Sequence, residues 1–261
     1  MFPVLIEIGP FTFYTYGLFV ALGLFTGVRI AIFMAAREGF QGKDVEDAFY
    51  TLLFYFAVGG LLGGRLLYAL IHSREFAGDP LSVLKVWQGG LVSYGGLAGG
   101  FAGFLVWQRK HAFAGWKKMA DWVSPSIVFG HALGRLGCLF AGCCFGRPTG
   151  LPWGLVFTNP RALAPLGIPL HPTQIYEFGF LSLAGIFLLK RYSLLKRSGR
   201  PDGTLFADYL TLYSAGRFAI EFFRGDDPRF WGLSPGQIAS LAVFAGSFVF
   251  RIFFLDKRGP I

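Results

Sequence analysis

Runs of about 20 mostly apolar residues recur along this chain and constrain its fold more than any other feature. An α-helix needs about that length to cross the hydrocarbon core of a bilayer. Seven runs qualify: 14–35, 48–71, 89–108, 122–144, 173–189, 205–223 and 235–255. We therefore predict an all-α integral membrane protein with seven transmembrane helices, forming a single membrane-embedded domain over residues 1–261.

The composition excludes the ordinary soluble and disordered classes. Hydrophobic residues make up 54% of the chain and charged residues 15%, whereas soluble domains carry about 25% charged residues. Glycine accounts for 37 of the 261 residues, which is about twice its usual share. Glycine is frequent in membrane helices because it lets two backbones approach closely.

The positive charges indicate an orientation in the membrane. Thirteen Lys and Arg residues fall after the first, third, fifth and seventh runs, and six fall in the loops on the opposite side. Basic loops stay in the cytoplasm, so we expect the N-terminus outside and the C-terminus in the cytoplasm. This topology accounts for the net charge of +9, and we expect no nucleic-acid partner.

Two segments outside the runs have their own character. Residues 145–172 form the longest predicted loop, carry six prolines and lie on the outer side, where a long ordered loop is a candidate substrate cover. Residues 1–13 contain Pro3 and Pro10 and are expected to be a short interfacial segment. They lack the basic start of a signal peptide.

Three arginines lie deep within the predicted spans, among glycine and other small residues: Arg65, Arg135 and Arg217. Charges inside a membrane are costly and usually functional. Arginine binds phosphate through two parallel hydrogen bonds, and few acids lie in the spans to pair with it. This favours an anionic ligand such as a lipid headgroup, with an anion path through a transporter or channel as the alternative.

Acidic and cysteine residues near these arginines leave several interpretations open. Glu221 follows Arg217 by four residues on one helical face, as a structural ion pair or as part of a phosphate clamp. Glu177 is within reach of His171 and Gln174, or serves as an interfacial cap. His131 precedes Arg135 by four residues and is more typical of a packed core histidine.

Three cysteines cluster near the end of the fourth run: Cys138, Cys143 and Cys144. They are too few for a disulfide scaffold. A structural zinc site uses four ligands, and this segment offers three thiols without a clear fourth. Small buried residues are the favoured interpretation, and we expect no metal and no cofactor.

Six short motifs, in order from Tyr16 to Arg224, resemble those of the prolipoprotein diacylglyceryl transferase family. The most specific is GRLGCLFAGCCFG at 134–146. The others are YGL at 16–18, GGR at 63–65, GGLVSYGGL at 89–97, HPTQIYE at 171–177 and RFAIEFFR at 217–224.

The resemblance implies a function. The family transfers the diacylglyceryl group of phosphatidylglycerol to the lipobox cysteine thiol of a prolipoprotein signal peptide, in the bacterial inner (cytoplasmic) membrane. A thioether forms and glycerol-1-phosphate leaves, which is the first step of lipoprotein maturation. The expected partners are phosphatidylglycerol, the prolipoprotein and other membrane lipids.

The resemblance also implies site residues. Arg135 and Arg217 match the family's two essential arginines, and Tyr16, Gly146 and Glu221 match further important positions. The predicted catalytic residues are Arg135, Arg217, Tyr94 and Glu221. The predicted substrate-binding residues are Tyr16, Arg65, Arg135, Gly146 and Arg224.

The sequence departs from the family pattern at three positions. Tyr94 stands where the family usually has His, Cys138 where it has Asn, and Cys143 where it has Glu. Tyrosine is a poor base at neutral pH because its free pKa is about 10. The alternatives are therefore a divergent homologue that acts on another lipid or acceptor, and a non-catalytic lipid-binding membrane protein.

Overall fold

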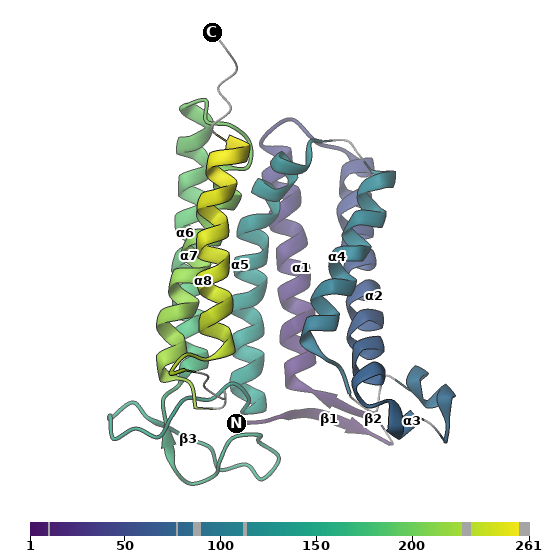
Figure 1. Ribbon diagram of the computed structural model, residues 1–261, viewed down its shortest axis with the longest axis vertical. Helices are drawn as coiled ribbons and strands as arrows, with labels where there is room; N and C mark the ends of the chain where they lie inside the picture. The colour runs from purple at the N-terminus through teal and green to yellow at the C-terminus, as the bar shows by residue number, and fades with distance from the viewer. Residues whose placement is uncertain (10, 77, 86–89, 112–113, 226–230, 256–261) are drawn as a thin grey trace. The chain divides into compact units, whose positions relative to one another are not determined.

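The computed structural model describes all residues except 10, 77, 86–89, 112–113, 226–230 and 256–261. The described part is mostly helical (Figure 1). It divides into two compact units, one formed by Met1–Met34 with Trp116–Ile261 and the other by Ala35–Gly115. Each unit is described by itself below.

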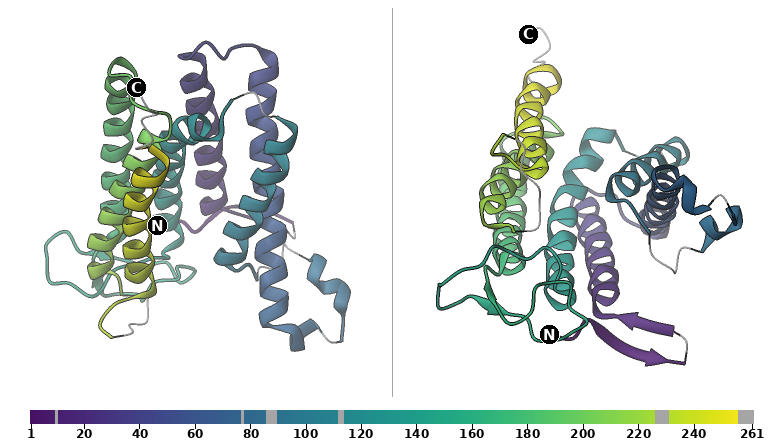
Figure 2. Two further views of the ribbon diagram at one scale, coloured as in Figure 1. Left: turned by 45° about the horizontal axis from the view of Figure 1, so that its top comes forward. Right: turned by 60° about the horizontal axis from the view of Figure 1, so that its bottom comes forward.

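Five helices account for most of the first unit. They are α1 (Thr15–Ala36, whose last two residues belong to the other unit), α5 (Trp116–Ala141), α6 (Thr173–Arg197), α7 (Thr204–Ile220) and α8 (Pro235–Phe250). A 3-10 turn, η3 (Glu221–Phe223), continues α7, and a π-helical turn, η4 (Arg251–Leu255), continues α8. Helix α5 packs on α6 and α7, and α6, α7 and α8 lie side by side (Figures 1 and 2).

Polar residues near the helix ends fix where α7 and α8 begin. The Asp121 carboxylate of α5 accepts hydrogen bonds from the backbone N–H groups of Gly203 and Phe206, both at 2.8 Å. These are two of the N–H groups that a helix start leaves unpaired. Helix α8 begins with a capping box formed by Ser234 and Gln237.

The second unit is built on the contact between α2 (Lys43–Ile71) and α4 (Ser93–Lys110), with α3 (Ser73–Phe76) and the 3-10 turn η1 (Pro80–Leu84) between them in the sequence. Glycines of the two helices face each other: a Cβ on Gly99 would overlap the carbonyl oxygen of Gly59, and one on Gly63 would overlap that of Gly95. The two backbones therefore touch, as small residues allow in membrane helices.

The expectation of an all-α chain needs correction at two places. Residues expected as an interfacial segment form an antiparallel hairpin of β1 (Val4–Ile8) and β2 (Phe11–Tyr14), and Pro10 lies outside the described residues. In the long loop, β3 (Leu155–Val156) pairs with β4 (Pro169–Leu170). Phe157, Ala164 and Leu170 form a small buried core there, so this loop is an ordered structure.

Five helices are long and apolar enough to cross a membrane: α1, α2, α5, α6, and α8 together with η4. The protein is thus a multi-pass membrane protein by length and composition. The predicted spans at 89–108 and 205–223 correspond to α4 and α7, of 18 and 17 residues, which fall outside this set. Seven spans and the orientation remain predictions, and Gly89 lies outside the described residues.

The predicted span 122–144 ends too late. Helix α5 begins earlier, at Trp116, and ends at Ala141, because Gly142 adopts a φ of 73°. Its N–H donates to Leu139 O, and the N–H of Cys143 donates to Cys138 O. This is the Schellman pattern that closes a helix at a glycine, so Cys143 and Cys144 lie beyond the helix.

Candidate functional site

A buried charge cluster joins α5, α6, α7 and η3. We use this name for Arg135, Glu177, Arg217, Glu221 and Arg224. The Glu177 carboxylate lies between two helices, with Oε2 2.5 Å from Arg135 Nε and Oε1 2.9 Å from Arg217 Nη1. Arg217 Nη2 also lies 2.7 Å from Glu221 Oε2. Glu177 thus links the two arginines that the sequence singled out.

Arg224 completes the charge cluster at longer range. Its guanidinium lies 3.8 Å from Glu177 Oε1 and 3.5 Å from Glu221 Oε2. The side chains of the two glutamates are 5% and 0% exposed, and that of Arg224 is 8% exposed. Three arginines against two glutamates leave a formal charge of +1 in a buried place, where charge interactions are strong. An anion that binds there would balance the charge.

Spacing along the chain positions three members of this charge cluster: Arg217, Glu221 and Arg224. Arg217 and Glu221 are four residues apart, and Glu221 and Arg224 three apart, so a helical turn brings each pair together. Ser234, the N-cap of α8, donates from Oγ to Glu221 Oε1 at 2.6 Å. The pairing of Arg217 with Glu221, predicted from spacing, is confirmed.

Glu177 is the site residue that sequence reasoning missed. The sequence leaves open whether it is an interfacial cap or a neighbour of His171 and Gln174. In the structure its carboxylate is buried and lies near three arginines. The available signal was the shortage of acids in the spans, since buried charges need partners and Glu177 opens a span. His131, the other open case, lies in α5 with its ring 5.7 Å from the Tyr213 ring.

Gly146 holds the loop against the segment that carries Arg224. Its N–H donates to His171 O at 3.0 Å, and it pairs with Arg224 in an isolated antiparallel bridge. The next residue, Arg147, donates its N–H to Phe223 O at 2.8 Å and its Nε to Arg224 O at 3.1 Å. Gly146 and Arg224, each predicted separately as a substrate-binding residue, are thus brought together.

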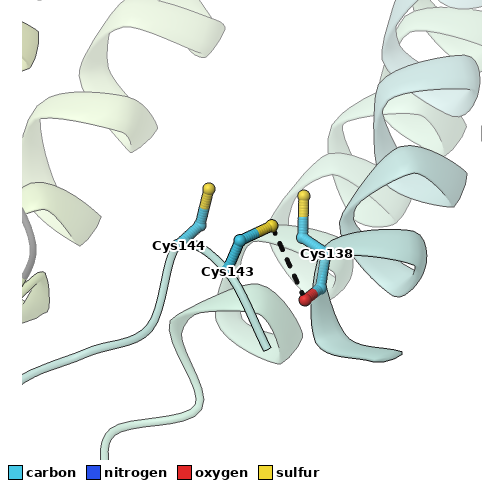
Figure 3. Close-up of side chains that lie close together, drawn as sticks. All are labelled: Cys138, Cys143 and Cys144. Carbon is cyan, nitrogen blue, oxygen red and sulfur yellow. Dashed lines mark hydrogen bonds between the residues drawn. The ribbon is translucent and has the colours of Figure 1, made fainter. Parts of the chain in front are cut away.

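The cysteine turn, residues 138–144, lies beside the charge cluster. Thr173 Oγ1 donates to Cys144 O at 2.7 Å, and Gln174 Nε2 donates to Cys143 O at 2.8 Å. Figure 3 shows the three thiols gathered at this turn, with Cys143 Sγ hydrogen-bonded to Cys138 O.

The remaining predicted residues lie elsewhere in the units. Tyr16, at the start of α1, packs against Gly137 of α5, where an added Cβ would sit 3.1 Å from Tyr16 Cδ2. Arg65 and Tyr94 belong to the other unit. Arg65 donates to the backbone oxygens of Val83 (2.7 Å), Ser82 (2.8 Å) and Gly90 (3.2 Å), which ties down the segment after α3. Tyr94, in the first turn of α4, is 69% exposed.

Comparison with known proteins shows which protein family this chain resembles. The family model described as "Prolipoprotein diacylglyceryl transferase" matches residues 3–253. Relatives named phosphatidylglycerol–prolipoprotein diacylglyceryl transferase include one from Clostridium tetani, 38% identical over 97% of this chain and 98% of its own. Another, from Solidesulfovibrio magneticus, is 35% identical over 99% and 95%. One from Proteus mirabilis is 33% identical over 99% and 94%.

Proposed function

The chain belongs to the prolipoprotein diacylglyceryl transferase family, and we propose that it transfers the diacylglyceryl group of phosphatidylglycerol to the lipobox cysteine thiol of a prolipoprotein. A sulfur–carbon bond forms, the bond between the glyceryl carbon and the phosphate oxygen breaks, and the thiol proton is released. The products are a thioether and glycerol-1-phosphate. This reaction is the first step of bacterial lipoprotein maturation, and the relatives are named after it.

The buried excess of positive charge is the observation that supports this proposal best. The leaving group is a phosphate, and its charge grows as the carbon–oxygen bond breaks. Arg135 and Arg217 present planar guanidinium groups that bind phosphate oxygens in pairs. Charges already in place in a buried site stabilise such a transition state without reorganisation.

The two glutamates position these arginines. Glu177 contacts both Arg135 and Arg217, and Glu221 contacts Arg217. A carboxylate on one edge of a guanidinium fixes its plane and leaves its other N–H groups for a ligand. Glu221 is therefore proposed to orient Arg217, as the sequence suggested, and Glu177 to hold both arginines.

The other predicted residues are proposed to bind substrate. Arg224, held by Gly146, adds positive charge for the headgroup. Tyr16 and Tyr94 are proposed to hydrogen-bond the lipid through their hydroxyl groups, and Arg65 is proposed as a further substrate-binding residue. Tyr94 stands where the family usually has histidine. Because tyrosine is a poor base, another group is proposed to deprotonate the thiol.

The membrane arrangement follows the same proposal. We propose a single membrane-embedded domain with seven transmembrane helices, N-terminus outside and C-terminus in the cytoplasm, in the bacterial inner (cytoplasmic) membrane. The basic loops that follow the first, third, fifth and seventh spans support this orientation. Residues 145–172 would then lie on the outer side, where a secreted prolipoprotein presents its signal peptide.

Arg135→Lys tests the role of the charge cluster. Purified protein is incubated with phosphatidylglycerol and a lipobox peptide, and mass spectrometry detects the diacylglyceryl-modified cysteine. Loss of the planar group should reduce product by about 10²-fold or more. The matched control is Arg161→Lys, because the Arg161 side chain is 60% exposed and pairs at the surface with Glu7, Nη1 to Oε1 at 2.6 Å. Near-normal turnover in Arg135→Lys would refute the headgroup-clamp role.

A further inference from the structure

The cysteine turn gathers three thiols. The Sγ atoms of Cys138, Cys143 and Cys144 all lie within 4.8 Å of one another, and all three cysteines are free. Cys138 is buried and the other two are half-buried. The proposed roles of the charge cluster use none of these thiols.

This spacing suits a metal ion. Zinc binds cysteine sulfur at about 2.3 Å, so three sulfurs around one zinc ion lie roughly 4 Å apart. Sulfur atoms within 4.8 Å of one another reach that arrangement by small rotations of their side chains. Thiolate ligands select thiophilic ions such as Zn²⁺ over Mg²⁺ or Ca²⁺. We propose that Cys138, Cys143 and Cys144 bind one Zn²⁺ ion.

The backbone holds the three thiols in place. The Schellman closure at Gly142 brings Cys138, three residues before the end of α5, close to Cys143, two residues after it. Cys144 has a φ of 57°, which residues other than glycine adopt rarely. The side chains of Thr173 and Gln174 fix the carbonyl groups of Cys144 and Cys143.

The metal keeps a position for a further ligand. Among the described residues, the group of candidate ligand side chains comprises these three cysteines. Zinc sites with three protein ligands and one exchangeable position are typical of catalysis. Gln174 is 1% exposed, and its Oε1 has no hydrogen-bond partner among the described residues. This buried acceptor lies beside the cysteine turn and would accept a hydrogen bond from a group held there.

The metal position lies about one helical turn from the charge cluster. Cys138 follows Arg135 by three residues on α5, and Gln174 precedes Glu177 by three residues on α6. Three residues of a helix rise about 4.5 Å. One Zn²⁺ with three thiolates carries a charge of −1, and the nearby arginines of the charge cluster would stabilise it.

The chemistry of the open position points to the acceptor thiol, an assignment that rests on the proposed function. A thiol that coordinates Zn²⁺ loses its proton, here to water. The resulting thiolate attacks the glyceryl carbon, and the carbon–oxygen bond electrons leave with the phosphate. Zinc would thus supply the deprotonation that Tyr94, at the family's usual histidine position, supports poorly.

Metal titration tests the site without relying on activity. The full chain in detergent is stripped with a chelator, dialysed, and titrated with Zn²⁺, and bound zinc is measured by elemental mass spectrometry. Co²⁺ serves as a spectroscopic probe, because thiolate-to-cobalt charge transfer gives an absorption band. The chain has three cysteines, so such a band reports on this turn. Protein with alkylated thiols is the control for non-specific binding.

We expect one equivalent of zinc, a thiolate–cobalt band, and loss of both in Cys143→Ser. If that variant fails to fold, the titration of the unsubstituted chain and of its alkylated control still shows whether the cysteine turn binds zinc. Absence of stoichiometric zinc and of the band overturns the site. So does a disulfide within the turn, seen as an intact mass lower by two hydrogens.

Activity separates this inference from the proposed function. Removal of zinc should lower product formation by about 10²-fold or more, and added Zn²⁺ should restore it. Product formation that is unaffected by chelation overturns thiol activation and leaves the transferase proposal standing. Stoichiometric zinc without product from phosphatidylglycerol refutes the transferase proposal and the assigned fourth ligand, and leaves the metal site.

Discussion

Gly146→Ala is the perturbation whose effect the structure specifies most directly. Gly146 lies between the loop residue His171 and the segment that carries Arg224. Its backbone needs no special conformation, since its φ is not among the positive values. The only thing that alanine adds is a methyl group, so the variant isolates crowding.

The magnitude follows from the distances. A Cβ on Gly146 would lie 2.5 Å from both the Cβ and the carbonyl oxygen of His171, and 2.8 Å from Phe223 O, whereas ordinary contact begins at 3.4 Å. The neighbours must therefore retreat by about 0.6–0.9 Å, and Arg224 follows Phe223 directly. Overpacking of this kind costs about 1–3 kcal/mol. A displacement near 1 Å at a reacting group lowers activity by about 10²-fold.

Two measurements check this expectation. The lipobox peptide assay should show a loss of about 10²-fold, and the midpoint of thermal unfolding in detergent should fall. Gly150→Ala is the matched control, because Gly150 lies in the same loop and an added Cβ meets nothing within 4 Å. Its activity and midpoint should stay unchanged.

The reasoning would be refuted by a Gly146→Ala variant with full activity and an unchanged unfolding midpoint. A fall in the midpoint with full activity would show that Gly146 stabilises the loop but does not position Arg224. Equal losses in Gly146→Ala and Gly150→Ala would show a general sensitivity of residues 145–172.

Three further predictions concern stability and Tyr94. Gly99→Ala should destabilise the α2–α4 pair by about 1–3 kcal/mol, whereas Gly96→Ala, with its nearest neighbour at 3.5 Å, should be neutral or gain up to about 1 kcal/mol; equal unfolding midpoints for the two variants would contradict this. Asp121→Ala should cost about 1–2 kcal/mol by removing the cap of α7, measured by denaturation in detergent, and an unchanged midpoint would count against the cap. Tyr94→Phe should lower product formation in the lipobox peptide assay, and unchanged activity would make Tyr94 a packing residue.

Much of the helical framework could be predicted because each span is a local property. The length of an apolar run sets α1 and α2 to within a few residues at each end. The end of α5 was placed three residues too late, because apolar Cys143 and Cys144 extend the run although Gly142 has already closed the helix. The hairpin at the N-terminus was missed because its side chains are largely exposed and its short strands carry no buried alternating pattern.

The candidate site divides in the same way. Arg217 and Glu221 could be paired from the sequence because four residues make about one helical turn. Gly146 and Arg224 came from the resemblance to the family, and the bridge between them became visible only in the structure. The metal-ligand potential of the three cysteines was discounted, because spacing along the chain does not show that their sulfur atoms meet.

The sequence by itself determined that this chain is a membrane protein of helices, which family it resembles, and which arginines lie where charges are costly. These follow from apolar run length, motif order and local spacing, all of which are written along the chain. Only the tertiary structure decided that Glu177 of α6 joins Arg135 of α5 to Arg217 of α7. The same holds for the contacts of Thr173 and Gln174 with the cysteine turn. Contacts between residues about 30 or more positions apart depend on how helices pack, and packing is a property of the whole fold.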